Sequence, residues 1–360
     1  MEKNKKIRKF IIHYYKKNKR KLPWREIQGK LQNPYYTLIA EIMLQQTRVD
    51  TVRNYYKNFL LKWPTINSLS SANQSDILTY WSGLGYYRRA INLHNTAKLI
   101  VKEHNSIIPN NYLTLIKMPG IGDYTAAAIL GFAYGKYSII IDTNIRKFLS
   151  RIYGLKSEQL SNKKIIFSLA SGLFPKKKSG DFAQAIMDYS SDICKSKKPK
   201  CKVCKINSYC NYKNIDEKNE LKIKVPKQKM YCVSHFYLYK NTYFLLRKKP
   251  LNLILGGMYE VPGSVWCKSK ISNDNYAFNF NDLKKYDKIP LEKIIRHDFT
   301  HITLYSNVII IKVISKKFKI SEPGTQDIKW FKLGDLKSYP IPSLTKKIID
   351  YSFSALSDLK

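Results

Sequence analysis

Four cysteines just past the middle of the chain constrain its fold more than any other feature of the sequence. They are Cys194, Cys201, Cys204 and Cys210, and their spacing is C-x6-C-x2-C-x5-C. Four thiolates on so short a stretch can bind a [4Fe–4S] cluster or a structural zinc ion. The spacing has neither the short gaps of ferredoxins nor the paired C-x2-C knuckles of a zinc ribbon. It favours iron–sulfur over zinc, and unrelated buried cysteines are the plain alternative.

The charge of the chain indicates a polyanionic partner. Its 360 residues include 64 Lys and Arg against 26 Asp and Glu, which gives a formal net charge of +38. Nucleic acid is the usual partner of so basic a protein. Only 11 of the basic residues are Arg, and a bias toward Lys also arises in AT-rich genomes, so the sign of the charge is more informative than its size.

The remaining sequence favours a cytoplasmic protein of more than one domain. Only Cys232 and Cys267 lie outside the cysteine loop, so a disulfide framework is not expected. The first 21 residues contain no apolar core of a signal peptide, and Lys136 interrupts the longest apolar run. We therefore expect neither a leader nor a membrane span.

Apolar spacing predicts a helical region followed by a smaller α+β region. Residues 38–60 and 86–104 carry apolar side chains at close to helical period. Residues 211–230 are polar and charged and are typical of a linker. Strand-like runs then follow at residues 233–240, 242–248, 302–315 and 328–333.

A Pro-Gly-x-Gly turn lies between two helical patterns, at Met118–Ala126. Gly120 and Gly122 let the backbone approach an anion closely and direct amide groups toward it. In a basic protein that anion is best read as a DNA phosphate. Taken alone, such a turn is more often ordinary turn chemistry.

Together these motifs resemble the helix-hairpin-helix DNA glycosylases with an iron–sulfur loop, and among them the MutY family of adenine glycosylases, related to endonuclease III. The matching segments are LPWRE (22–26), AEIMLQQTRV (40–49), GLGYYRRA (83–90), MPGIGDYTAAAI (118–129), IDTNIRK (141–147) and the cysteine loop. The resemblance implies a multidomain protein with an all-α helix-hairpin-helix core, a [4Fe–4S] loop and an α+β Nudix-like C-terminal domain.

The same resemblance implies domain boundaries. The helical region covers residues 1–210, with a six-helix domain at about 22–130 and an iron–sulfur domain formed by 1–21 together with 131–210. A linker at 211–230 then leads to a Nudix-like mismatch-recognition domain at 231–360.

The resemblance assigns catalysis to Glu41 and Asp142, with Tyr124 and Asn144 in support. Glu41 lies in an apolar helical segment, where a carboxyl group should have a raised pKa that suits a general acid; the alternative is a solvated helix charge. By resemblance it protonates adenine at N7, and Asp142 stabilises the sugar cation. Asp142 also stands where a helix N-cap is expected, and one residue can do both.

The residue at Tyr124 separates two branches of the family. In the endonuclease III branch a lysine at this place forms a Schiff base and cuts the strand. Tyrosine offers no nucleophilic amine, so we expect a monofunctional enzyme that leaves an abasic site.

Four further residues are expected to contact DNA from which the target base has been extruded. By resemblance, Gln46 and Tyr86 fill the gap left by the base, Leu84 lies beside them and Thr47 lies near the opposite base. Ordinary core packing is the alternative for Tyr86 and Leu84.

The resemblance places the adenine in a pocket formed by Arg20, Leu22, Trp24 and Arg25. The family usually has a glutamate six residues before the first cysteine, where this chain has Asp188. Because the aspartate side chain is shorter by one methylene, a bridging water is an alternative to the direct hydrogen bond to adenine.

The C-terminal half resembles the domain that reads 8-oxoguanine in this family. Residues 246–250 and 256–262 match its first hairpin, whereas the Glu-rich Nudix box is missing. Phe299, Thr300 and His301 occupy the place of a Phe-Ser-His recognition loop; a strand histidine is the alternative for His301.

The sequence therefore predicts an adenine-specific DNA glycosylase of base excision repair. Its expected partner is double-stranded DNA containing A:8-oxoguanine or A:G mispairs, and we expect a monomer in the bacterial cytoplasm, associated with the nucleoid through DNA and with no membrane. The alternatives are an endonuclease III-like glycosylase/AP lyase and an inactive DNA-binding iron–sulfur protein.

Overall fold

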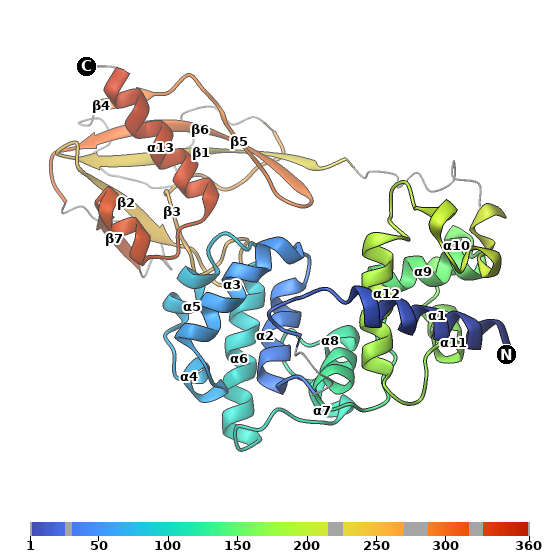
Figure 1. Ribbon diagram of the computed structural model, residues 1–360. Helices are drawn as coiled ribbons and strands as arrows, with labels where there is room; N and C mark the ends of the chain where they lie inside the picture. Colours follow the sequence, from blue (N-terminus) through green and yellow to red (C-terminus); the bar gives the residue numbers. More distant parts are fainter. Residues whose placement is uncertain (1, 26–30, 215–225, 270–286, 317–326, 359–360) are drawn as a thin grey trace. The chain divides into compact units, whose positions relative to one another are not determined.

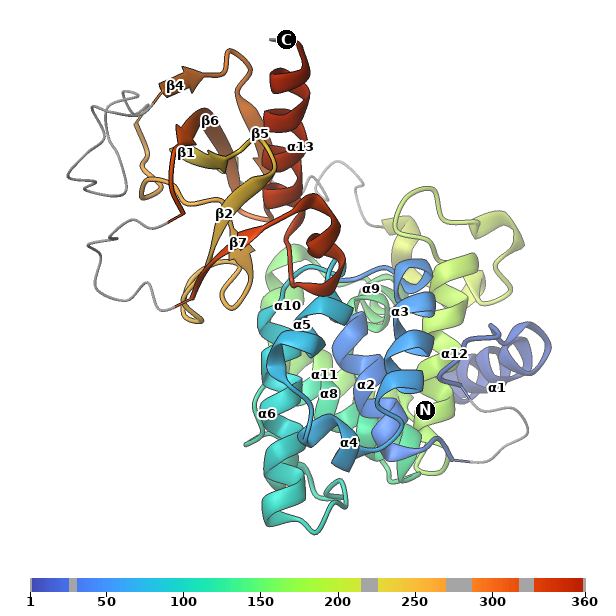
Figure 2. The ribbon, with the colours of Figure 1, turned by 90° about the vertical axis from the view of Figure 1, so that its left-hand side faces the viewer.

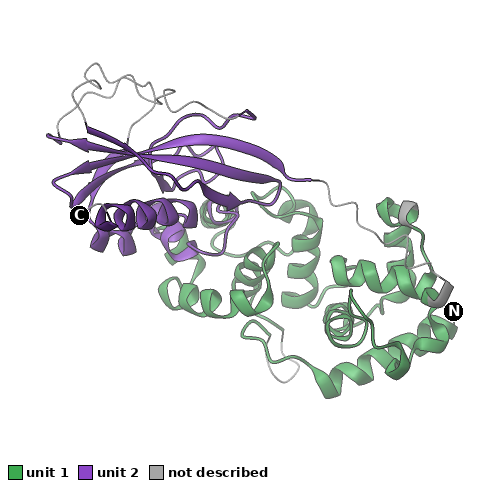
Figure 3. Cartoon of the chain, turned by 90° about the horizontal axis from the view of Figure 1, so that it is seen from above, with its two compact units in different colours: residues 1–71, 92–223 green, residues 72–91, 224–360 purple. Residues whose placement is uncertain are grey.

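The computed structural model describes residues 2–25, 31–214, 226–269, 287–316 and 327–358. The chain divides into two compact units (Figure 3): Met1–Ser71 with Asn92–Ile223, and Ala72–Ile91 with Lys224–Lys360. Much of the predicted linker, at residues 215–225, lies outside the described residues. Its described ends are ordered, as a 3₁₀ turn at Asn211–Asn214 and as the beginning of a strand at Gln228. The predicted domain boundaries remain predictions.

The first unit is helical (Figure 1). Its elements are α1 (Glu2–Asn18), α2 (Pro34–Leu44), α3 (Val49–Lys62), α4 (Ile66–Ser70), most of α6 (Arg88–Glu103), α7 (Tyr112–Leu115), α8 (Asp123–Ala128), the π-helix η1 (Ile129–Ala133), α9 (Thr143–Tyr153), α10 (Ser157–Ser161), α11 (Lys163–Leu173), α12 (Ser179–Asp192) and the 3₁₀ helices η2 (Cys201–Val203), η3 (Asn207–Tyr209) and η4 (Asn211–Asn214). None of the helices in the described part of the chain is long and apolar enough to cross a membrane.

The apolar pattern at residues 38–60 is helical, but it belongs to two helices and not to one. Asn33 caps α2 by accepting hydrogen bonds from the amides of Tyr35 and Tyr36. The helix ends at Gln45, and Gln46 adopts a left-handed conformation with φ of 56°. The side chain of Gln45 donates to the carbonyl of Gly120 and the hydroxyl of Thr125, both at 3.2 Å. These two hydrogen bonds connect the end of α2 to the hairpin.

The hairpin consists of α7, a turn and α8. Gly120 has φ of +79°, and a Cβ atom there would lie 2.9 Å from Cβ of Asn92. Only glycine meets both demands without strain. The hydroxyl of Thr96 donates to the carbonyl of Pro119 at 2.7 Å, so α6 supports the turn from behind.

One hydrophobic core joins the N-terminal helix to the segments that surround the cysteines. Ile7 and Ile11 of α1 are fully buried with residues of α9, α11 and α12. Helices α1 and α12 lie side by side (Figure 1). Helix α12 also passes close to η1, since a Cβ on Gly180 would lie 2.3 Å from the carbonyl oxygen of Gly131. This packing positions α12 beside the site described below.

The second unit contains α5 (Gln74–Trp81), the first residues of α6, and a mixed sheet covered by α13 (Ser343–Asp358) (Figure 2). The strands are β1 (Gln228–Tyr239), β2 (Tyr243–Lys248), β3 (Tyr259–Glu260), β4 (Asp287–Pro290), β5 (Ile295–Asp298), β6 (Ile302–Val313) and β7 (Ile328–Phe331). Their order is β3-β2-β1-β6-β4, with β7 paired to β2 and β5 to β6.

The long strands β1 and β6 run parallel at the centre of this sheet. Alternate side chains of β1 face opposite sides: Phe236 packs in the core that contains α13, and Tyr237 packs in the smaller core of the other face. The four strand-like runs read from the sequence correspond to β1, β2, β6 and β7.

Candidate active site

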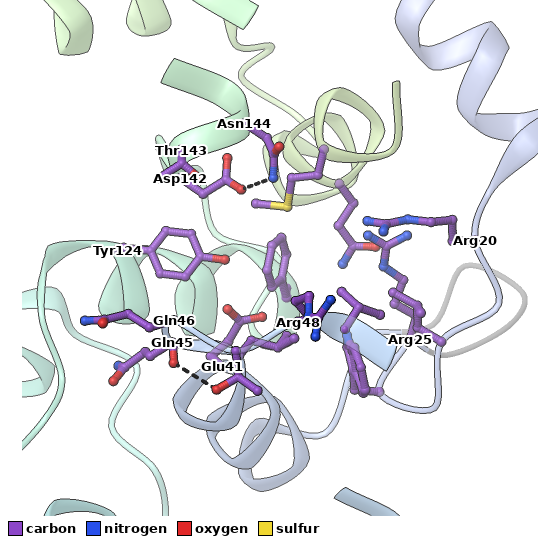
Figure 4. Close-up of a pocket in the computed structure, with 18 of the residues that line it drawn as sticks. Arg20, Arg25, Glu41, Gln45, Gln46, Arg48, Tyr124, Asp142, Thr143 and Asn144 are labelled. Carbon is purple, nitrogen blue, oxygen red and sulfur yellow. Dashed lines mark hydrogen bonds between the residues drawn. The ribbon is translucent and has the colours of Figure 1, made fainter. Parts of the chain in front are cut away.

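A cavity of about 650 Å³ opens in the first unit (Figure 4). The loop before α2, the end of α2, the start of α8, the start of α9 and part of α12 line it. It brings together most of the predicted catalytic and adenine-pocket residues with two predicted DNA contacts: Arg20, Leu22, Trp24, Arg25, Glu41, Gln46, Thr47, Tyr124, Asp142 and Asn144.

Glu41 lies on the inner face of α2 and is only 5% exposed. Its Oε2 has no hydrogen-bond partner among the described residues. Burial raises the pKa of Glu41 from 4.5 to about 7, with a smaller upward contribution from Asp142. Tyr124 and Arg25 oppose this rise, through a hydrogen bond and through charge respectively. The raised pKa expected for a carboxyl in this apolar segment is confirmed, and the solvated alternative is wrong.

Asp142 caps α9, as its place in the sequence suggested. Its Oδ1 accepts a 2.7 Å hydrogen bond from the amide of Ile145, and its Oδ2 accepts a 2.8 Å bond from Nδ2 of Asn144. Burial raises the pKa of Asp142, and these hydrogen bonds oppose the rise. The cap fixes the carboxylate at the edge of the cavity, so capping and facing the cavity are compatible.

Tyr124 stands on α8, where its ring faces the cavity between Glu41 and Asp142 (Figure 4). Burial and the two nearby carboxylates raise its pKa well above 10, so the hydroxyl stays protonated and donates. Among the described residues that line the cavity, the cationic side chains are all arginines and none is lysine.

Asp188 is placed differently from the prediction. Its side chain is 1% exposed and it does not line the cavity. One oxygen accepts from Nε of Arg20 at 2.5 Å, and the other accepts from Nη1 of Arg25 at 2.7 Å and from the amide of Arg20 at 3.1 Å. Both oxygens are therefore occupied from the protein side. The carboxylate anchors two arginines that themselves face the cavity.

The predicted DNA contacts fall into two groups. Gln46 and Tyr86 are exposed and have positive φ values of 56° and 50°, a conformation that is strained for such side chains and concentrates at functional sites. Leu84, in contrast, is only 6% exposed. This burial agrees with the core-packing alternative for Leu84, and its role as a DNA contact stays a prediction. Gly120 and Gly122 lie in the hairpin turn described above.

The predicted recognition residues form the tight turn between β5 and β6 in the second unit. The amide of Phe299 donates to the carbonyl of Ile302 at 2.8 Å, and the Phe299 ring packs against Trp266. Thr300 and His301 are exposed. Within the same unit, the hydroxyl of Tyr86 is hydrogen-bonded to that of Thr300, so a predicted wedge and a predicted recognition residue meet.

The four cysteines are partly buried in one loop. Nη1 of Arg151, a fully buried residue, lies 3.5 Å from Sγ of Cys194, and its guanidinium donates to the carbonyls of Lys195 and Ser196 at 2.7 and 3.1 Å. Burial raises the pKa of Cys210, and the charges of the three other cysteines raise it further.

Four cysteine thiols can bind an iron–sulfur cluster or a structural zinc ion. Among the described residues, no group of three or more His, Cys, Asp or Glu side chains is arranged to hold a metal ion.

Several residues that line the cavity were not predicted from the sequence, including Arg48, Phe132, Arg146 and Gln184. Arg48 lies within the AEIMLQQTRV motif, which was a signal for it. Phe132 reaches the cavity from the π-helix η1, a rare element that is frequent at functional sites. Gln184 accepts a 2.7 Å hydrogen bond from the hydroxyl of Tyr15. No sequence pattern indicated Phe132 or Gln184.

Comparison with known proteins supports the resemblance to DNA glycosylases that the sequence motifs indicated. Residues 39–175 match the HhH-GPD superfamily of base excision DNA repair proteins, and residues 234–351 match the NUDIX domain. An adenine DNA glycosylase of Buchnera aphidicola subsp. Baizongia pistaciae is 36% identical over 348 residues, 94% of each chain. An adenine DNA glycosylase of Arabidopsis thaliana is 30% identical over 90% of this chain and 59% of its own length.

Among solved structures, a thermostable thymine-DNA glycosylase is 30% identical with a TM-score of 0.55, over 59% of this chain and 98% of that one. The match over 94% of the chain, the helix-hairpin-helix core and the C-terminal Nudix-like sheet all indicate the same family. The chain belongs to the adenine DNA glycosylase family of HhH-GPD base excision repair proteins.

Proposed function

We propose that this chain hydrolyses the N-glycosidic bond of adenine in mispaired duplex DNA. The observation that carries the proposal is the environment of the Glu41 carboxyl group. It is a buried carboxyl with a pKa of about 7 and an unpartnered oxygen, in a cavity that Asp142 also lines. Cleavage of a glycosidic bond requires protonation of the leaving group and stabilisation of a sugar cation, and paired carboxyl groups supply both.

In the proposed reaction, Glu41 donates its proton to N7 of adenine. The C1′–N9 bond then breaks with its electron pair passing to the base, and the negative charge of Asp142 stabilises the cation left on the sugar. Water adds to C1′ and returns a proton to Glu41. The products are free adenine and an abasic site. A general acid supplies a factor of about 10²–10⁴, so the electrostatic contribution of Asp142 must supply a further part.

Arg20 and Arg25 line the cavity as donors held by Asp188. We propose that they orient the extruded base through the acceptor nitrogens of its ring. In this arrangement Asp188 acts on adenine through the arginines and not by direct contact. Trp24, which packs edge-on against Tyr56 at 5.4 Å between ring centroids, and Leu22 supply the apolar wall.

We further propose a monofunctional enzyme. Strand cleavage through a Schiff base needs a nucleophilic amine, and no lysine lies among the described residues that line the cavity. Tyr124 has a pKa raised well above 10 and is a poor nucleophile near neutral pH. The two alternatives are an endonuclease III-like glycosylase/AP lyase and an inactive DNA-binding iron–sulfur protein.

The remaining parts of the proposal concern the DNA around the extruded base. Gln46 and Tyr86 fill the space left by the extruded adenine, and the turn at Phe299–His301 reads 8-oxoguanine or guanine opposite it. We propose a monomer that acts on DNA in the bacterial cytoplasm. The cysteine loop would hold a [4Fe–4S] cluster, which would fix the loop and its lysines as a rigid basic surface.

The reaction is tested by single-turnover assays on A:8-oxoguanine and A:G duplexes. We expect free adenine, and strand breaks only after hot alkali. Glu41→Gln should abolish release with duplex binding retained, whereas Glu103→Gln, at an exposed position of α6, should release adenine normally. Strand cleavage before alkali together with efficient borohydride trapping would favour the lyase, and unchanged release by Glu41→Gln would refute the assigned mechanism.

A further inference from the structure

A second hollow in the first unit lies away from the cavity of Glu41 and shares no residue with it. It measures about 400 Å³ and is lined by Lys6, Lys9, Phe10 and His13 of α1 and by Lys205, Ser208 and Tyr209 of the cysteine loop. The two segments are about two hundred positions apart in the sequence. Their convergence was not visible in any motif.

The charge of this hollow is one-sided. Three lysines and a histidine line it, and none of the described residues that line it is a carboxylate. Lys6 has an ion pair with Glu2 at 2.9 Å, in which both side chains are more than half exposed, and such a pair is weak. The like charges repel one another, and an anion placed between them would remove that repulsion.

The side chains that face the hollow come from a single face of α1. Lys6, Lys9, Phe10 and His13 are separated by three, four and seven positions, the spacing that places residues on one side of a helix. Phe10 and Tyr209 also pack against the hydrophobic core. Both aromatic residues are partly buried, whereas the cationic side chains that line the hollow are exposed.

The combination selects a ligand with a phosphate and a planar ring. Lysine ammonium groups and a serine hydroxyl bind phosphate oxygens, and aromatic rings accept stacked bases of any identity. The volume lies within the range of small-molecule sites, which is about 300–1,000 Å³. We propose that this hollow binds a free nucleoside diphosphate, with its phosphates on the lysines and its base on the aromatic rings.

The proposal is independent of the base-excision reaction, since none of these residues lines the catalytic cavity. The test is calorimetric titration of the full-length protein with ADP, pyrophosphate and adenosine as separate probes. We expect saturable binding of one ADP per chain, weaker binding of pyrophosphate and no binding of adenosine. A short duplex without a mispair, titrated at the same ionic strength, tests a nucleotide within DNA.

A matched pair of variants separates a site from general charge. Lys9→Met/Lys205→Met removes one ammonium from each wall. Lys16→Met/Lys202→Met removes the same charge from the same two segments, at exposed positions that do not line the hollow. We expect about tenfold weaker ADP binding in the first variant, because two charge-assisted contacts are lost, and less than about twofold weakening in the second.

Both variants should retain the thermal midpoint of the parent protein. If only duplex binding weakens selectively in Lys9→Met/Lys205→Met, these lysines belong to the DNA-binding surface and the proposal is overturned. It is also overturned if ADP binding does not distinguish the two variants, or if ADP binding does not saturate.

Discussion

Replacing Glu41 with glutamine should change the stability of this chain by an amount that depends on pH. Burial raises the pKa of the folded carboxyl to about 7, against 4.5 for an exposed glutamate. Below pH 4.5 the group is neutral in both the folded and unfolded states. As pH rises through about 7, ionisation of the buried group costs the folded state free energy, and the stability present at low pH is lost.

The size of this effect follows from the same two values. One pKa unit corresponds to about 1.4 kcal/mol, so the difference between 4.5 and about 7 amounts to roughly 3 kcal/mol. Glutamine resembles the neutral carboxyl in shape. We therefore expect Glu41→Gln to match the parent protein near pH 4.5 and to be more stable by roughly 3 kcal/mol above pH 8.

The assay is urea unfolding of both proteins from pH 4.5 to 9, followed by tryptophan fluorescence. Glu103→Gln removes a charge from an exposed position of α6 and should stay within about 0.5 kcal/mol of the parent at every pH. A difference between Glu41→Gln and the parent that does not grow with pH would refute the reasoning. So would a variant that is less stable than the parent at pH 9.

Three further predictions follow from the site. Tyr124→Phe removes a hydrogen bond that lowers the pKa of Glu41, so the alkaline fall of the single-turnover rate should move to higher pH; an unmoved profile would contradict that role. Asp188→Asn leaves a buried arginine without its counter-ion, and urea unfolding should show a loss of about 3–5 kcal/mol in the free energy of unfolding; an unchanged midpoint would contradict the role of Asp188 in anchoring the two arginines. Cys204→Ser should lower bound iron from about four atoms per chain, whereas Cys232→Ser, a buried position outside the loop, should not; equal iron in both would contradict Cys204 as a ligand of the cluster.

The helical region and its motifs were predictable because their signals are local. The cap at Asp142 depends on neighbouring residues of one helix start, and its hydrogen bonds to Ile145 and Asn144 are contacts across two or three positions. The apolar surroundings of Glu41 were visible for the same reason, and they account for its raised pKa. The strands β1, β2, β6 and β7 were visible as apolar runs.

Other features depend on contacts between distant segments. The break after α2 at Gln45 depends on hydrogen bonds to the hairpin, which no helical period records. The ion pairs of Asp188 could not be predicted because its partners, Arg20 and Arg25, lie more than 160 positions away. Leu84 and Tyr86 stand two positions apart in one motif, yet the first is buried and the second is exposed.

By itself, the sequence determined the residue types that the chemistry needs and the local structures that carry them: a carboxyl in an apolar helix, a capping aspartate, a glycine hairpin and four thiolates. Only the tertiary structure decided which of these groups share one cavity, which arginines occupy the carboxylate of Asp188, and that α1 meets the cysteine loop around a cationic hollow. The physical reason is that periodicity and capping act within a few residues, whereas burial, counter-ions and convergence depend on packing between segments that the sequence keeps apart.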